Sequence, residues 1–318
     1  MCYTKYMENK MLKFLKQPNI KFDLHIHTNH SDGNAELKDI IKLANEKNLE
    51  YISITDHNTL DAYAELRKNN NYGFAGKIIT GVELNVLASG YYIELLAYDF
   101  DVERMKKWKF LNKNVFIKNN KKILKEVVVK AEKLGFKITK NLQYTNKKGL
   151  YFKELYADIV KYEENQPLLK ELGVTKYRDF LRKQIFSPKG KLYVLVKNSL
   201  PSAKQVCDYV HACGGKVVLA HPFYYDSIAG ENIIRTMLAY DIDGIECAHF
   251  SHTPEQIDYA LSVCADKGLI VTGGSDFHNK KRYVKNKEVK SDLGYLNMSK
   301  QEVNTNILKK CYVDKNIE

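Results

Sequence analysis

Seven short stretches of apolar and β-branched residues recur along the chain, each ending in polar residues, and they predict β-strands. Most are followed by the apolar spacing of an amphipathic helix, and the last helix opens with Thr253-Pro254-Glu255, which is typical of a helix N-terminus. The predicted strands are Lys21–His27, Glu50–Asp56, Lys77–Leu84, Tyr91–Tyr98, Lys216–His221, Asp243–Ala248 and Leu269–Ser275. The predicted helices are Glu36–Asn48, Leu60–Asn70, Ala203–Ala212, Ile228–Tyr240 and Thr253–Lys267. This alternation predicts an α/β fold with parallel strands, and seven strands favour a barrel.

The alternation stops between about residues 101 and 200, where the pattern is helical. Helices are expected over Val102–Leu134, Leu150–Glu164 and Lys176–Ile185. Because this stretch lies between the fourth and fifth strands, it predicts a helical insertion at the end of the barrel where the loops from strand to helix emerge. We therefore expect a barrel built from residues 20–100 and 206–290, a basic helical cap at 101–205, and a tail at 291–318 that packs on the barrel.

Charge is distributed unevenly between these parts. The 318-residue chain has a formal net charge of +12, yet residues 101–205 alone hold 26 Lys and Arg against 10 Asp and Glu. The remainder is therefore slightly acidic. Two interpretations stay open for the basic part, namely solvated helix faces and a surface that meets a polyanionic substrate.

Membrane and disulfide-dependent classes are excluded by composition. No run approaches the 18 or so apolar residues of a membrane span, and residues 1–20 lack the apolar core of a signal peptide. The six cysteines form no CxxC pair, so we expect reduced thiols. These features predict a cytoplasmic protein with no membrane partner, and they leave its oligomeric state open.

Groups suited to metal binding gather where the predicted strands end. Strand side chains alternate between faces, so the outer residues of an H-x-H or D-x-H pattern point the same way and can bind one ion. Glu83 ends an apolar run, where an ionised carboxylate is costly unless it is paired or bound to a metal. The strand-end groups are His25, His27, Asp32, Asp56, His57, Glu83, His221, Glu246, His249, His252, Asp276 and His278. Together they predict a multinuclear site of imidazoles and carboxylates, which suits Zn, Mn or Fe.

These residues stand in motifs that resemble the PHP superfamily, named for polymerase and histidinol phosphatase. The similarity covers most of the chain, and the later motifs look most like the branch of nucleoside 3′,5′-bisphosphate phosphatases and 5′→3′ exoribonucleases. The matching motifs are FDLHIHTNHSDG (22–33), ITDHNT (54–59), GVEL (81–84), VLAHP (218–222), GIECAHFSH (244–252) and GGSDFH (273–278).

The resemblance implies a distorted (β/α)7 barrel with two or three divalent ions, and it assigns a ligand set. His25, His27 and Asp276 would hold the first ion, and Glu83 would bridge to a second ion held by His221 and His252. Asp32, His57 and His278 would hold the third. His252, rather than His249, stands where the family keeps its histidine. His30 and His211 match no motif, and we expect packing or surface roles for them.

The implied reaction is hydrolysis of a phosphomonoester or terminal phosphodiester by attack of a metal-bound hydroxide, with Glu83, Asp276 and His221 at the catalytic centre. The expected substrate is a phosphorylated small molecule or a short 5′-phosphorylated oligonucleotide. A second phosphate or the adjoining backbone would be held by cations of the insertion, for which the candidates are Lys121, Lys122, Arg178, Arg182 and Lys183.

Two alternatives remain. A histidinol-phosphate phosphatase, or another small-molecule phosphatase, would share the metal cluster, although a basic cap suits a cationic substrate poorly. A non-catalytic module would use its metals to stabilise a fold that binds nucleic acid. The chain also departs from the family pattern: Asn58 replaces an aspartate, Asn85 replaces a small residue, and Glu154 stands where a histidine is expected. Substrate choice is therefore less determined than the chemistry.

Overall fold

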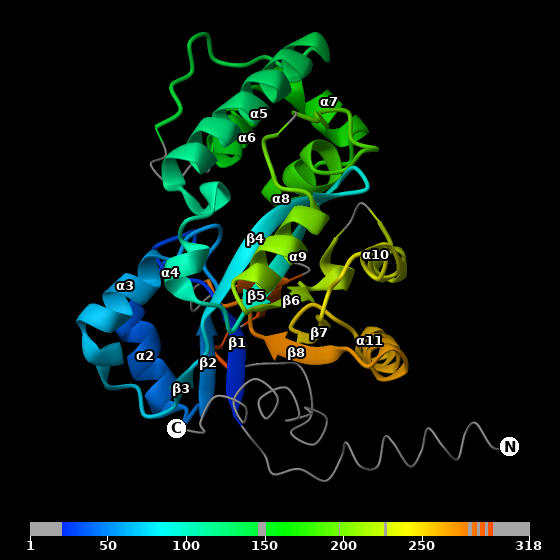
Figure 1. Ribbon diagram of the computed structural model, residues 1–318. Coiled ribbons are helices and arrows are strands. Elements are labelled where there is room, and N and C mark those ends of the chain that lie inside the picture. Colours follow the sequence, from blue (N-terminus) through cyan, green and yellow to red (C-terminus); the bar gives the residue numbers. More distant parts are fainter. Residues whose placement is uncertain are drawn as a thin grey trace, which may run out of the picture.

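The computed structural model describes residues 21–145, 151–196, 198–225, 228–278, 282–284, 287–289 and 292–294. Its strands form one sheet of three, one of five and a separate antiparallel pair (Figure 1). The three-stranded sheet contains β1 (Phe22–Ile26), β2 (Tyr51–Ile54) and β3 (Lys77–Ile78). The five-stranded sheet contains β4 (Gly81–Ala88), β5 (Tyr91–Tyr98), β6 (Lys216–Leu219), β7 (Gly244–His249) and β8 (Ile270–Gly274). The pair consists of β9 (Arg282–Val284) and β10 (Lys287–Val289).

The prediction of all-parallel strands is wrong at β5. This strand is antiparallel to both β4 and β6, whereas β1–β2–β3 and β6–β7–β8 are parallel. The cause is the connection between β4 and β5, in which Ser89 and Gly90 both have positive φ and form a two-residue hairpin turn. A parallel connection needs a crossover of a dozen or more residues, and this turn leaves no room for one.

The predicted strand over Lys77–Leu84 is divided into β3 and β4, which lie in different sheets. At the division, a Cβ on Gly81 would lie 2.1 Å from the Ser53 Oγ, so only glycine allows this approach to β2. Isolated bridges join the two sheets, one between Ile26 and Phe277 and one between His57 and Glu83. The sheets thus meet at two places without a continuous ladder, and a closed seven-stranded barrel is not confirmed.

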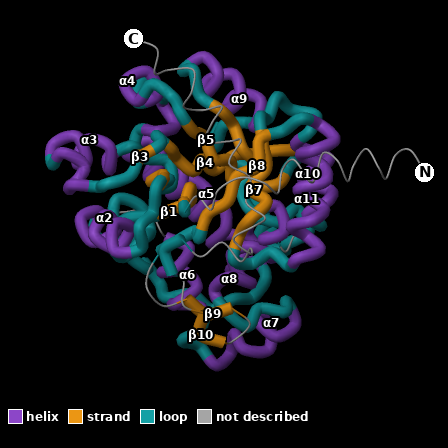
Figure 2. Tube along the Cα trace, turned by 90° about the horizontal axis from the view of Figure 1, so that it is seen from below, coloured by secondary structure: helices purple, strands orange, loops and turns teal. Residues whose placement is uncertain are grey.

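Five helices lie around the outside of the strands (Figure 2). They are α2 (Leu37–Glu46), α3 (Asp61–Lys68), α9 (Ala203–Ala212), α10 (Gly230–Met237) and α11 (Pro254–Lys267), all close to their predicted bounds. Capping boxes open two of them, Ser202 with Gln205 at α9 and Thr253 with Gln256 at α11. Their apolar faces share one core with both sheets. Among the described residues, no helix combines the length and the apolar character needed to cross a bilayer.

The helical part lies beyond one end of the strands (Figure 1) and has a buried cluster of its own. It comprises α5 (Lys113–Lys133), α6 (Tyr151–Ile159), α7 (Gln166–Glu171), α8 (Tyr177–Asp179) and the π-helix η4 (Phe180–Ile185). The short α4 (Val102–Met105) that precedes them buries Met105 in the core shared by the two sheets. One long helix from Val102 to Leu134 is not formed. The Asn112 side chain accepts hydrogen bonds from the Asn114 and Val115 N–H groups and starts a new helix there.

The C-terminal tail is described only at residues 292–294, and the other residues of 291–318 lie outside the described part. The Gly294 N–H donates to the buried Asp23 carboxylate at 2.7 Å, and Leu293 is buried in the main core. These contacts hold the three residues against the strands.

An acid-sensitive carboxylate stabilises the helical part. Asp179 accepts hydrogen bonds from the Thr175 N–H and Oγ1 and from the Lys183 Nζ. Burial alone would raise the pKa of Asp179, but these bonds lower it to about 2. Because the folded-state pKa is depressed, this contribution to stability is present above the ordinary pKa of 3.8 and is lost as the pH falls towards 2.

We expect Asp179→Asn to lower the melting temperature at pH 7 by about 2–4 °C. The difference in melting temperature between the variant and the wild-type protein should narrow between pH 4 and pH 2, since the wild-type carboxylate loses its charge by protonation in this range. Circular dichroism melts would show this. The control is Asp208→Asn, which removes an exposed pair with Lys204 and should shift the melt by less than about 1 °C. A constant gap down to pH 2 would contradict the assignment.

Candidate metal centre

The structure brings eight of the nine predicted ligands together at the carboxyl ends of the strands. His25 and His27 lie at the end of β1, His57 follows β2, and Glu83 lies in β4. His221 follows β6, Asp276 and His278 follow β8, and Asp32 comes from the loop after β1. The side chains from β1, β2, β6 and β8 therefore face one another because these parallel strands end at the same edge. Glu83 joins them from the start of β4, where a bridge pairs it with His57.

The first group is built from His25, His27, Glu83 and Asp276. The two Nε2 atoms are 3.1 Å apart, and Glu83 Oε2 lies 3.3 and 3.2 Å from them. Asp276 Oδ1 lies 3.8 Å from the His25 Nε2 and 3.4 Å from the His27 Nε2. Four donors of a tetrahedral site, each about 2.0–2.2 Å from its ion, lie about 3.4 Å from one another. The spacing of the His25, His27 and Asp276 donors therefore fits one bound ion, and Glu83 Oε2 contacts the same two imidazoles.

The second group shares Glu83 with the first. Glu83 Oε1 lies 3.0 Å from the His221 Nε2, and Glu94 Oε2 lies 3.7 Å from the same nitrogen. Sequence reasoning missed Glu94. Glu94 could have been found in the same way as Glu83, because it is a lone carboxylate in an apolar strand, Tyr91–Tyr98.

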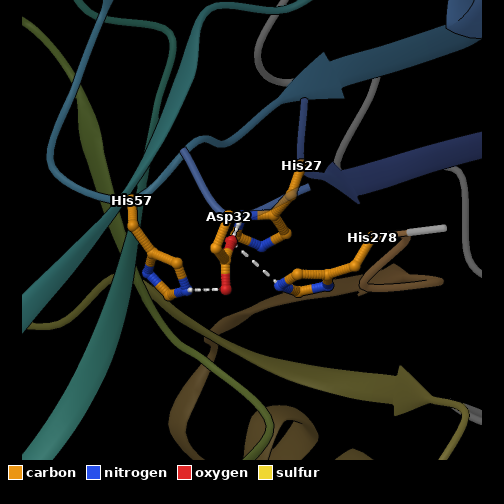
Figure 3. A group of neighbouring side chains, drawn as sticks. All are labelled: His27, Asp32, His57 and His278. Atoms are coloured by element: carbon orange, nitrogen blue, oxygen red, sulfur yellow. Dashed lines mark ion pairs between the residues drawn. The ribbon is translucent and has the colours of Figure 1, made fainter. Parts of the chain in front are cut away.

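The third group surrounds Asp32 (Figure 3). Its Oδ1 lies 3.1 Å from the His278 Nε2 and 3.6 Å from the His27 Nδ1, and its Oδ2 lies 3.9 Å from the His57 Nε2. His57 also faces the other groups, because its Nδ1 is 3.2 Å from Glu83 Oε2. The three groups are thus contiguous.

Whether this arrangement fits metal ions can be judged from its buried donor atoms. The Nδ1 atoms of His27 and His57 are buried and face Asp32 Oδ1 and Glu83 Oε2, yet they make no hydrogen bond among the described residues. Buried imidazole lone pairs and carboxylate oxygens that converge without partners are unfavourable, and divalent ions relieve this. The donor set therefore fits metal ions.

Electrostatics within the cluster agree with cation binding. Burial alone would raise the pKa of Glu83, but the neighbouring His57 and His25 hold it well below its usual range. Burial alone would lower the pKa of His25, but Glu246 and Glu83 raise it well above its usual value. The Glu83 carboxylate is thus kept ionised, and a metal ion would replace the proton on the His25 imidazole.

Two carboxylates orient the cluster without joining the three groups. Glu246 Oε1 is 2.9 Å from the His25 Nδ1, and its Oε2 accepts a hydrogen bond from the His221 N–H. The His25 Nε2 is thereby turned towards the first group. Asp56 accepts hydrogen bonds from Thr28 and Ser31, which fixes the loop that carries Asp32.

Neither His249 nor the predicted ligand His252 belongs to the three groups, although both imidazoles are buried. The His249 Nε2 lies 3.4 Å from Asp276 Oδ2, and Ser251 donates its N–H to the His249 Nδ1. The His252 Nδ1 donates to the Cys247 carbonyl at 2.9 Å, and its ring packs edge-on against Phe223. β7 extends to His249, and the end of the strand therefore brings the His249 side chain close to Asp276.

A cavity of about 300 Å³ lies beside the third group. Asp32, His57 and Glu94 line it together with residues of the helical part, among them Arg182 and Lys153. The Arg182 guanidinium lies 3.5 Å from Glu94 Oε2 and 4.3 Å from the Tyr224 ring centre. Of the five predicted substrate contacts, only Arg182 lines this cavity.

The other four candidate cations are placed elsewhere. Arg178 lies over the Tyr224 ring and donates to the Tyr224 carbonyl, close to Arg182. Lys183 pairs with Asp179 at 2.9 Å. Lys121 and Lys122 are exposed on α5, which turns Phe116, Asn120 and Ile123 towards the cavity instead. His30 and His211 pair with Glu65 and Asp243 outside the metal groups.

Comparison with known proteins places the chain in a family. A model of the PHP domain matches residues 23–250. The 5′-3′ exoribonuclease Rnm of Escherichia coli is 26% identical over 262 residues, which cover 81% of this chain and 85% of that protein. The phosphoribosyl 1,2-cyclic phosphate 1,2-diphosphodiesterase of Eggerthella lenta is 26% identical over 276 residues, which cover 81% and 94% of the two chains.

A solved structure from Bifidobacterium adolescentis, described as a metal-dependent phosphoesterase, has the same fold. Its TM-score is 0.62 at 22% identity, over 95% of this chain and 99% of that chain. The fold is therefore mixed α/β, and the predicted PHP membership and phosphoric ester hydrolase class are confirmed. The chain belongs to the PHP domain family.

Proposed function

We propose that this chain hydrolyses phosphate esters of nucleotides or of short 5′-phosphorylated oligonucleotides. Two or three divalent ions of Mn, Fe or Zn would be held by the three groups described above, with Glu94 as an additional ligand. The observation that carries the proposal is the position of Glu83, whose two oxygens face different imidazoles, Oε2 those of His25 and His27 and Oε1 that of His221. Such a carboxylate is suited to bridge two ions.

The residues divide into roles. When bound, divalent ions lower the pKa of water towards neutrality and neutralise charge on the phosphate oxygens. Glu83, Asp276 and His221 are proposed as the residues of the catalytic centre because they would position the charge of these ions. Glu246 keeps the His25 ring oriented through its 2.9 Å contact. Arg182 is proposed to meet the phosphate, since its fixed cation borders both the cavity and Glu94.

The substrate proposal is supported by the cavity and by the relatives. Arg182 and Lys153 provide cations along the cavity wall, which suits a substrate with more than one phosphate. The relative from Escherichia coli is named for cleavage of RNA from the 5′ end, and that from Eggerthella lenta for cleavage of a cyclic phosphodiester. Both names describe hydrolysis of phosphate esters of ribose compounds.

A panel of esters tests the proposal. Purified protein is assayed with Mn²⁺ and with EDTA on 3′-phosphoadenosine 5′-phosphate, a short 5′-phosphorylated RNA and histidinol phosphate. We expect metal-dependent release of phosphate or mononucleotide from either nucleotide substrate. Turnover of histidinol phosphate alone would instead support the small-molecule phosphatase. No turnover with metal bound would support a non-catalytic nucleic-acid-binding module.

Lys153 is expected to hold the second phosphate of such a substrate, because it is exposed and lines the cavity. Lys153→Ala should raise the KM for 3′-phosphoadenosine 5′-phosphate about fivefold and leave that for adenosine 5′-monophosphate (AMP) unchanged, as is usual for one exposed charge contact. Steady-state kinetics with both substrates measure this. Lys122→Ala is the matched control, an exposed lysine of the same helical part that does not line the cavity. Equal effects of the two variants would contradict the assignment.

A further inference from the structure

The cavity beside the third group has the size and position of a ligand site. Its volume of about 300 Å³ is at the lower end of the range for small-molecule pockets. One wall belongs to the strand ends, with Asp32 and His57, and the opposite wall to α5, α6 and η4. A molecule that fills it would therefore have one end at the metal centre.

Aromatic side chains form much of the wall away from the metal centre. Phe116, Phe152, Phe186 and Tyr92 line it from four different segments. Tyr92 stacks on Phe186 with ring centres 5.0 Å apart, and Phe152 meets Phe186 edge-on at 5.9 Å. These contacts fix the rings before any ligand binds. Planar π-faces at fixed positions suit a planar aromatic group.

A buried amide supplies a specific polar contact in the same cavity. Asn58 is only 5% exposed, and its Oδ1 accepts a hydrogen bond from the Asn85 N–H at 3.2 Å. This bond leaves the amino group as the free end of the amide, and the Asn58 Nδ2 has no hydrogen-bond partner among the described residues. A buried donor without a partner is unfavourable, and a ligand acceptor atom would satisfy it. Asn58 and Asn85 both line the cavity.

We propose that this cavity receives the base and ribose of a single nucleotide, whose phosphate lies at the edge formed by Asp32 and His57. The base packs among the aromatic rings, and Asn58 donates its Nδ2–H to an oxygen or nitrogen acceptor of the nucleoside. A cavity of this volume holds one nucleoside rather than two, so a longer substrate would present its terminal nucleotide alone. The inference rests on the proposed function and specifies its substrate.

The test compares two esters that carry the same phosphate on the same ribose carbon, AMP with a base and ribose 5-phosphate without one. Phe116 is the residue to change, because it lines the cavity without belonging to the buried cluster of the helical part. Phe116→Ala should raise the KM for AMP about tenfold, the usual effect of removing one stacking partner, and leave the kinetics of ribose 5-phosphate unchanged. Phe116→Tyr keeps the ring and should match the wild type.

A binding measurement separates this inference from the proposed function. Calorimetric titration of adenosine, which has no phosphate to hydrolyse, measures binding in the cavity of the metal-loaded protein, and Phe116→Ala should weaken this binding about tenfold. Absent adenosine binding, or binding that the variant leaves unchanged, would overturn the inference. An equal rise in KM for both esters would do the same. Loss of all turnover with metal, while adenosine binding still depends on Phe116, would reject the proposed function and keep the nucleoside pocket.

Discussion

Glu83→Gln is expected to abolish phosphate ester hydrolysis, with kcat reduced by a factor of about a thousand or more. It removes a charge that belongs to the first two groups and that faces His57 of the third. Glu83 is 1% exposed and contacts His25, His27, His57 and His221. Glutamine has the same shape, but its neutral amide has one acceptor oxygen and an NH₂ group that cannot bind a cation. Metal content by plasma mass spectrometry should fall together with activity.

A matched carboxylate provides the control for this prediction. Glu65 is also paired with a histidine, at 2.7 Å from the His30 Nε2, but it lies outside the three groups. Glu65→Gln should leave metal content unchanged and kcat within about twofold. Full metal content and near-normal turnover in Glu83→Gln would reject Glu83 as the bridging ligand, and with it the proposed mechanism.

The period-two alternation of strands explains why most of the candidate centre could be predicted from sequence. His25 and His27 point the same way because they are two residues apart on one strand, and the shared edge of parallel strands brings His221 and Asp276 to them. The pattern does not reveal how far a strand continues. β7 extends to His249, and this brings the His249 Nε2 to 3.4 Å from Asp276 Oδ2, a contact that the motifs did not predict.

Strand direction and the contacts of the helical part were harder to predict. Tyr91–Tyr98 has the composition of a strand in either direction, and only the turn at Ser89 and Gly90 shows that it runs antiparallel. The basic charge of residues 101–205 also did not indicate which side chains line the cavity. Lysines on a cap helix favour solvent, whereas the cavity is lined by apolar residues of α5 such as Phe116 and Ile123.

Arg182 is the one predicted cation that lines the cavity, and its replacement should have the second large effect on activity. The residue is only 17% exposed, and its guanidinium is held between the rings of Tyr224 and Tyr225, at 4.3 and 5.3 Å. A cation fixed beside the centre stabilises charge that develops on the phosphate without reorganising. We expect Arg182→Ala to lower kcat/KM about a hundredfold, as loss of one preorganised donor commonly does. Arg182→Lys should recover little of the lost kcat/KM, because lysine lacks the planar set of donors that arginine has.

Metal affinity distinguishes this role from that of a ligand or a merely structural residue. Arg182 lies 3.5 Å from Glu94, so its removal takes a positive charge away from a carboxylate of the second group. Arg182→Ala should therefore retain metal or bind it more tightly while turnover falls, the opposite of the result expected for Glu83→Gln. Lys183→Ala is the matched control on the same π-helix, since Lys183 is 42% exposed and pairs with Asp179 away from the cavity. It should keep kcat/KM within about twofold. Metal loss in Arg182→Ala, or equal losses of activity in the two variants, would show that Arg182 supports the fold rather than the phosphate.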